Sequence, residues 1–279
     1  MSIIKKILDM DQRIIYLGMF IALAYPILSP VILPVAIQDY STQAFNFAVS
    51  IPDGSYVLIE GGNAAATHPQ CGPGLTANIY HLLTKQCKLV FFSITAEPAY
   101  WTQVEIDNAL AKLPATVAAK NGVNWVNLGY ISGGESGVAA LAADIRSVVS
   151  KDHFGTPIND LPMMKDINSA KNFAAAFWWG GSEGSIPYGI RQLVGPYNLP
   201  MSGSCTTNEV PNYSPYVSSG QLKGLFGGIR GSAEYELLLK VPGPALAQAM
   251  ATNIGGLYFL GLVLLGNILY LTQRLRGEK

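Results

Sequence analysis

Two long stretches without a charged side chain, one near each end, constrain this chain more than any other feature. Residues 14–38 read IIYLGMFIALAYPILSPVILPVAIQ, and an equally uncharged stretch covers residues 246–272 near the other end. Each is longer than the roughly 20 residues with which a helix crosses a hydrocarbon core of about 30 Å. We therefore expect two transmembrane helices, with both ends of the chain tied to a lipid bilayer.

The first stretch has one alternative interpretation. Pro26, Pro30 and Pro34 lie in its second half, where each removes a backbone N–H, so we expect a kink or an early end to the helix. Lys5 and Lys6 also suit the charged start of a cleaved signal peptide. The stretch is too long for the apolar region of a signal peptide and lacks a convincing cleavage site, so we favour a retained anchor.

Basic residues on the outer flanks of the two stretches predict the orientation. None occurs between Arg13 and Lys85. Those outside the stretches are Lys5, Lys6, Arg13, Arg274, Arg276 and Lys279. Because positive flanks stay in the cytoplasm, we expect residues 1–13 and 273–279 to be cytoplasmic and residues 46–240 to form an extracytoplasmic domain in the cell membrane.

The charge content narrows the function classes. Lys and Arg number 18 and balance 18 Asp and Glu, which argues against nucleic-acid binding because phosphate neutralisation needs clustered positive charge. Only 13% of residues are charged, about half the usual share. A surface this poor in charge favours association with copies or with membrane-protein partners. A surface rich in Ser, Thr and Asn is the alternative.

Apolar runs and helical patterns alternate through the central domain. The expected strands are residues 55–60, 88–94, 125–130, 172–179 and 201–206, and the expected helices are residues 74–85, 102–120, 136–150, 188–194 and 222–240. This β-α order predicts an α/β fold with a Rossmann-like parallel sheet sandwiched by helices.

A glutamate lies at or just after the end of each expected strand. The candidate ligand-binding residues there are Glu60, Gly61, Glu97, Gly133, Gly134, Glu135, Ser136, Glu183, Thr207 and Glu209. Because ligands bind beyond the carboxyl ends of parallel strands, these residues predict an acidic crevice for a cation, a sugar or an amine. Two carboxylates there would also suit acid–base hydrolysis. The alternative is structural, since acidic residues favour the first turn of a helix.

Two common chemistries fit the turn at residues 133–137 poorly. Ser136 stands at a strand-to-helix turn, but Val138 occupies the position of the last glycine in a G-x-S-x-G nucleophile motif, and no histidine follows far downstream. A G-x-G-x-x-G or phosphate-loop lysine is also missing from the sequence, which argues against an NTP or NAD site. The sequence predicts no particular cofactor, metal or catalytic residue.

Glycines interrupt the helical pattern between residues 220 and 239. They suggest close backbone packing, against either the sheet or a neighbouring subunit. The candidate interface residues are Gly224, Gly227, Gly228, Arg230, Gly231 and Glu234, with Arg230 and Glu234 spaced to form an ion pair.

Three cysteines fall in the domain expected outside the cell. A disulfide between Cys71 and Cys87 would clip the first helix to the next strand, although spacing alone does not establish that bond.

Several runs in the domain resemble a family of membrane-anchored prokaryotic proteins of unassigned function. They are residues 122–130 (GVNWVNLGY) with 133–135, residues 155–157 with 161–164, residues 213–216 with 219–222, and residues 227–231 with 233–236. The resemblance implies the layout of a helix, an α/β domain and a second helix. It implies no activity, cofactor or catalytic residue.

The sequence favours a non-enzymatic function. We expect a structural or accessory subunit that assembles through its extracytoplasmic domain into a larger membrane complex. The alternatives are an extracytoplasmic ligand-binding module, a hydrolase that uses strand-end glutamates, and an accessory subunit of a transport or respiratory complex.

Overall fold

The computed structural model describes residues 11–29, 36–180 and 185–275, and the chain divides into two compact units. Residues 36–245 form an α/β domain, and residues 1–35 with 246–279 form a helical unit. Each unit is described by itself.

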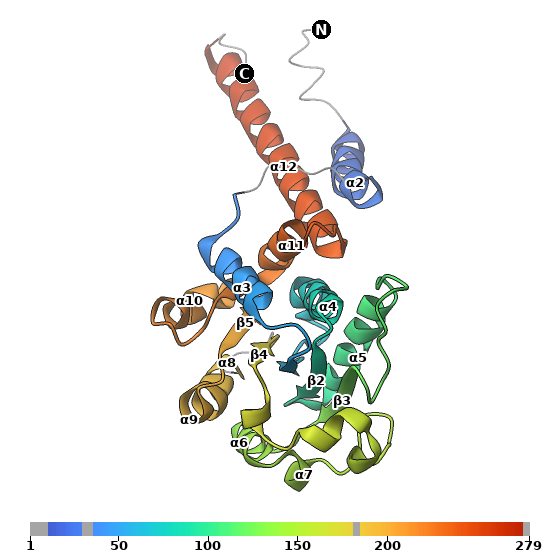
Figure 1. The fold of residues 1–279 in the computed structure, drawn as a ribbon. Helices are drawn as coiled ribbons and strands as arrows, with labels where there is room; N and C mark the ends of the chain where they lie inside the picture. Colours follow the sequence, from blue (N-terminus) through green and yellow to red (C-terminus); the bar gives the residue numbers. More distant parts are fainter. Residues whose placement is uncertain (1–10, 30–35, 181–184, 276–279) are drawn as a thin grey trace. The chain divides into compact units, whose positions relative to one another are not determined.

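The α/β domain contains a sheet of six parallel strands (Figure 1). They are β1 (Tyr56–Glu60), β2 (Lys88–Ser93), β3 (Trp125–Tyr130), β4 (Ala175–Trp178), β5 (Met201–Cys205) and β6 (Leu225–Gly227). Their spatial order is β3-β2-β1-β4-β5-β6. The predicted α/β class with a Rossmann-like parallel sheet is confirmed. The order reverses between β1 and β4, which makes their carboxyl ends the topological switch point where such sheets bind ligands.

Helices cover both faces of the sheet, because nearly every strand residue is buried and both faces need apolar cover. One face packs against α3 (Asp39–Ser50), α4 (His68–Thr84), α5 (Ala96–Leu110) and α11 (Gly228–Leu239). The other packs against α6 (Glu135–Ala143), α7 (Ile145–Val148), η1 (Ile158–Asp160), η2 (Pro162–Asp166), η3 (Ala170–Asn172), α8 (Ser185–Gly189), the π-helix η4 (Ile190–Val194), α9 (Gly195–Tyr197) and α10 (Val210–Ser218). A 3-10 turn, η5 (Thr207–Glu209), follows β5.

A polar network lies within the core formed by α4, β4 and α11. The Tyr235 hydroxyl accepts a hydrogen bond from Asn78 Nδ2 at 2.8 Å and lies 3.1 Å from His81 Nδ1. Trp179 Nε1 donates to Asn78 Oδ1 at 3.1 Å. Burial lowers the pKa of His81 to about 4, so this histidine is neutral at physiological pH. The network therefore satisfies the buried Asn78 amide on both sides.

The sequence misplaced one element of the domain, extended another beyond its end at Leu110 and missed several helices. Residues 225–227, expected within a helix, form the edge strand β6, and α11 begins only at Gly228. Gly224 precedes β6 with φ +157°, and a Cβ there would lie 2.1 Å from the backbone nitrogen of Ala44. This close approach to α3 keeps the chain extended and delays the helix. The helices α3 and α10 were not predicted.

The helical unit contains α2 (Gln12–Leu28) and most of α12 (Pro244–Leu275). By length and composition, α12 is the one helix among the described residues that is suited to cross a membrane. The predicted span 14–38 is not confirmed, because α2 ends at Leu28 after 17 residues, two positions beyond Pro26. Pro30 and Pro34 lie outside the described residues.

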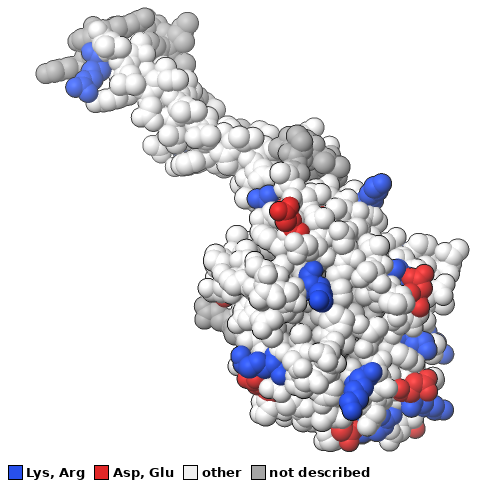
Figure 2. Space-filling model, turned by 60° about the vertical axis from the view of Figure 1, so that its left-hand side comes forward, with Lys and Arg blue, Asp and Glu red and all other residues white. Residues whose placement is uncertain are grey.

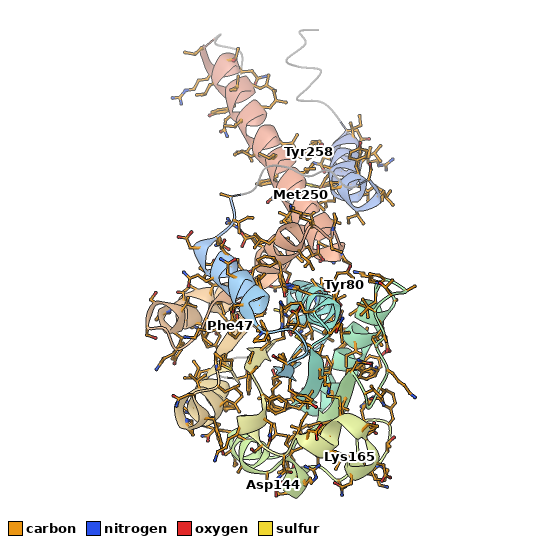
Figure 3. The ribbon with its side chains drawn as sticks, viewed as in Figure 1. Phe47, Tyr80, Asp144, Lys165, Met250 and Tyr258 are labelled. Atoms are coloured by element: carbon orange, nitrogen blue, oxygen red, sulfur yellow. The ribbon has the colours of Figure 1, made fainter. Side chains whose placement is uncertain are left out.

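The two helices of this unit pack closely. Tyr258 of α12 lies beside α2 (Figure 3), and its hydroxyl donates to the Ile15 carbonyl at 3.1 Å. A Cβ on Gly18 would lie 2.2 Å from that hydroxyl oxygen. A Cβ on Gly255 would lie 2.6 Å from the Leu23 side chain. Small residues thus allow the two helices to approach, as in membrane helix pairs.

Candidate functional site

Glu60, the last residue of β1, is fully buried at the switch point. Its register partners in the sheet are Phe92 on β2 and Trp178 on β4, so an aromatic residue stands on each side of it. Its Oε1 accepts the Ile94 N–H at 3.5 Å, whereas Oε2 has no hydrogen-bond partner among the described residues. Burial raises the pKa of Glu60 to about 8, against a smaller opposing effect of the N–H groups of Ile94 and Gly62. The side chain is therefore mainly a neutral carboxylic acid at pH 7.

Two glycines let the ends of β1 and β4 meet without side chains between them. A Cβ on Gly62 would lie 2.8 Å from both carboxyl oxygens of Glu60 and 3.0 Å from the Cα of Gly180. A Cβ on Gly180 would lie 3.1 Å from Nε1 of Trp178 and 2.3 Å from Oγ of Ser185. The Glu60 carboxyl and the Trp178 indole nitrogen therefore border the same small region of backbone.

Buried polar atoms without a hydrogen-bond partner among the described residues occur at several places in the domain, and four of the nine belong to residues at or just after the ends of β1 and β4. Asn63, which follows Gly62, is 1% exposed, and neither its Oδ1 nor its Nδ2 has a partner among the described residues. The indole Nε1 of Trp178 is also buried and unpartnered. We call Glu60, Asn63 and Trp178 the switch-point cluster. A buried polar atom left without a hydrogen bond costs about 1–3 kcal/mol, so the cluster is expensive for the fold.

Two further predicted residues lie close to this cluster. Gly61 donates its N–H to the Phe92 carbonyl at 2.9 Å, and its carbonyl accepts from Thr102 Oγ1 at 2.7 Å. Glu97, in the first turn of α5, is exposed and accepts the Ala65 N–H at 2.8 Å. Glu97 therefore fastens the loop between β1 and α4 to the first turn of α5.

The predicted residues after β3 form a separate structural group. Gly133 and Gly134 have φ values of +97° and +55°, which explains glycine at both positions. The Ser136 hydroxyl donates to the Gly133 carbonyl at 2.8 Å. Glu135 receives two hydrogen bonds of 2.7 Å from Arg191, and this pairing lowers its pKa to about 2. This carboxylate is thus fixed by a guanidinium from η4.

The predicted residues after β5 are also engaged locally. Both the N–H and the hydroxyl of Thr207 contact Oε1 of Gln70, at 3.1 and 3.3 Å. Glu209 is buried and accepts from Asn212 Nδ2 at 3.1 Å. Glu183 lies outside the described residues. Among the described glutamates, no hydrogen bond joins one to another, so only Glu60, Gly61 and Glu97 gather around the loop after β1.

A histidine–glutamate pair beside this loop was not predicted. His68 Nε2 contacts Oε1 of the buried Glu105, whose Oε2 accepts from the Thr76 hydroxyl. The His68 ring lies 4.3 Å from the Trp101 ring, centre to centre. The two partners are 37 positions apart in the sequence, and their spacing carries no recognisable motif.

The candidate interface glycines pack within the domain. A Cβ on Gly227 would lie 2.5 Å from Val210, one on Gly228 would lie 2.0 Å from Thr207, and one on Gly231 would lie 2.7 Å from the Phe226 backbone. Gly224 packs against α3, as described above. Of the two alternatives, close packing inside the domain is therefore the one that the structure shows.

The predicted ion pair on α11 is present. Arg230 Nε donates to Oε1 of the buried Glu234 at 2.9 Å, and Arg230 Nη2 donates to the Ala36 carbonyl at 2.8 Å. The same Glu234 oxygen accepts the Gln38 N–H at 3.3 Å. The pair thus fastens the first residues of the domain to α11.

The proposed disulfide is not formed. Cys71, Cys87 and Cys205 are all buried thiols without a disulfide bond. Cys71 lies in the first turn of α4 and Cys87 lies three residues beyond its end, and a helix of 17 residues is about 25 Å long. A disulfide needs Cα atoms within about 7 Å, so the helix itself keeps these two cysteines apart.

Within the described ranges, no group of three or more His, Cys, Asp or Glu side chains is arranged to hold a metal ion. Comparison of the chain with protein-family models, with curated proteins and with solved structures gives no match.

Proposed function

We propose that this chain is a membrane-anchored ligand-binding module, and that its α/β domain holds a small polar molecule at the carboxyl ends of β1 and β4. The observation that carries the proposal is the switch-point cluster. Its three side chains bring buried, unpartnered polar atoms to the position where parallel sheets of this strand order bind ligands. Natural folds tolerate such a cost mainly where function requires it.

The test compares small-molecule retention by two variants of the full chain in detergent. Asn63→Leu removes both amide atoms from the cluster, and Asn108→Leu makes the same change at an exposed position on α5. Each protein is incubated with a small-molecule cell extract, washed, and analysed by mass spectrometry. We expect compounds that are retained by the wild type and by Asn108→Leu but lost from Asn63→Leu. Equal retention profiles in all three proteins would refute the proposal.

We propose further that the helical unit anchors the domain at the extracytoplasmic face of a membrane, with α2 and α12 both in the membrane and both termini in the cytoplasm. The contacts of Tyr258 and Gly255 with α2 support a helix pair, and the basic flanks support the orientation. Because the three native thiols are buried, an impermeant maleimide reports on added cysteines. In whole cells, Lys171→Cys should be labelled and Ser2→Cys should not. Labelling of Ser2→Cys but not of Lys171→Cys would show the opposite membrane topology.

Assembly into a larger membrane complex remains a second proposal. Its support is the low charge, since most of the face in Figure 2 is uncharged, with the blue and red side chains gathered mainly at its lower end. The glycines of α11 do not support this assembly proposal, because they pack against other parts of the same domain. Native mass spectrometry of the chain after gentle extraction tests it, since a strictly monomeric mass would argue against assembly.

A further inference from the structure

We infer that the molecule held by the switch-point cluster is a primary amine that also carries a neutral oxygen, as in an amino alcohol or amino sugar, with the Glu60 carboxylate as its counter-ion. This inference rests on the proposed function and names the chemical class of its ligand.

The charge around Glu60 excludes an anionic ligand. Among the described residues, no Lys, Arg or His forms an ion pair with Glu60. A phosphate or carboxylate placed here would itself be buried without a cation to compensate its charge, which is strongly unfavourable. The ligand is therefore neutral or cationic.

The aromatic neighbours favour a cation. Phe92 and Trp178 are the register partners of Glu60, and their rings meet edge to face at 5.8 Å between centres with an interplanar angle of 83°. Aromatic rings attract an ammonium group through their quadrupole, most strongly in a site without water. An ammonium group bound by Glu60 would therefore have an aromatic residue on each neighbouring strand.

The unpartnered atoms specify the rest of the ligand. Glu60 Oε2 and Asn63 Oδ1 are acceptors, and these match the N–H donors of an ammonium group. Asn63 Nδ2 and Trp178 Nε1 are donors and need an oxygen on the ligand. A carboxylate oxygen would again lack a basic partner, so the oxygen belongs to a hydroxyl or carbonyl group.

Binding is then coupled to release of a proton. The neutral Glu60 carboxyl loses its proton to solvent as the ammonium group enters, and the site keeps its net charge. The other titratable groups on the elements around Glu60 are Glu97 at the loop after β1, and Glu105 with its partner His68 beyond Thr102. None of them contributes a charge effect to the Glu60 pKa of about 8, so the coupling belongs to Glu60 itself.

The experiment uses isothermal titration calorimetry of the full chain in detergent with three probes. Ethanolamine carries both groups, ethylamine lacks the oxygen, and ethylene glycol lacks the cation. We expect ethanolamine to bind most tightly, and its affinity to rise roughly 50-fold from pH 6 to pH 8, with close to one proton released at pH 6. Glu60→Gln should bind ethanolamine and ethylene glycol equally, without the pH dependence, whereas Asp160→Asn, at an exposed position in η1, should behave like the wild type.

The outcomes separate this inference from the proposed function. Ethylene glycol binding as tightly as ethanolamine, or an affinity that is independent of pH, would overturn the amine class while leaving a ligand site in place. Binding of no probe would also overturn the amine class, and the extract experiment with Asn63→Leu would still decide the proposed function. If Glu60→Gln does not fold, the pH dependence and proton release of the wild type decide alone.

Discussion

Replacement of Glu60 by glutamine should change how the stability of the domain depends on pH. The folded-state pKa of about 8 lies above the ordinary glutamate value of 4.5, so the folded domain holds a proton that the unfolded chain releases. This contribution is fully present below pH 4.5 and is lost as pH rises through 8. At about 1.4 kcal/mol per pH unit, the wild type should lose about 3.5 kcal/mol of stability between pH 5 and pH 8 from this group.

The assay is urea unfolding of the full chain in detergent at both pH values. Glu60→Gln keeps the shape of the protonated side chain but has no proton to lose, so the loss attributable to Glu60 should disappear. Glu97→Gln, which removes an exposed carboxylate from the same loop region, should retain it. A pH dependence that is equal in the wild type and in Glu60→Gln would refute the claim that this carboxyl is buried in its neutral form.

Three other substitutions test the packing of the domain. Gly224→Ala should cost about 3 kcal/mol of stability, because the new Cβ would lie 2.1 Å from the backbone nitrogen of Ala44, and urea unfolding measures this loss. Tyr235→Phe should cost about 1–3 kcal/mol in the same assay, since Asn78 loses the acceptor of a buried 2.8 Å hydrogen bond. Arg191→Ala breaks an exposed ion pair and should leave the thermal midpoint unchanged within error, so a clear decrease would show that η4 depends on this contact.

Most of the sheet was predictable because its strands are short, continuous apolar runs followed by glycine or polar residues. The run at residues 125–130 coincides with β3, and the run at 55–60 differs from β1 by one residue. The edge strand β6 has only three residues and continues directly into a helix, so its periodicity is too short to recognise. Its pairing with β5 is a tertiary contact that a local pattern does not contain.

The site was predictable only in part. The position of Glu60 at a strand end was clear from the sequence, but the identity of its neighbours depends on strand order. Trp178 lies beside it only because β4 follows β1 in the sheet although it is fourth in the chain. From the sequence, Glu135 was as good a candidate for the ligand site as Glu60. In the structure, its carboxylate is instead hydrogen-bonded to Arg191, which lies 56 positions away in the chain.

The glycines of residues 224–231 illustrate the same limit. Their number indicated close backbone approach, and the structure shows it. The partner was ambiguous, because the sequence pattern is the same for a contact within the domain and for one with a neighbouring subunit. The contacts of Gly224 with α3 and of Gly231 with β6 identify the partner as the domain itself.

The most direct test of a ligand site at the switch point compares two buried asparagines. Asn63 and Asn78 are both at most 1% exposed, but the amide of Asn78 is hydrogen-bonded to Tyr235 and Trp179, whereas that of Asn63 has no described partner. The measurement is the free energy of unfolding of Asn63→Leu and Asn78→Leu by urea titration of the full chain without added ligand. We predict that Asn78→Leu loses about 2–4 kcal/mol, while Asn63→Leu is unchanged or up to about 2 kcal/mol more stable. A loss of stability at Asn63 as large as that at Asn78 would show that its amide serves the fold, and would contradict the ligand site.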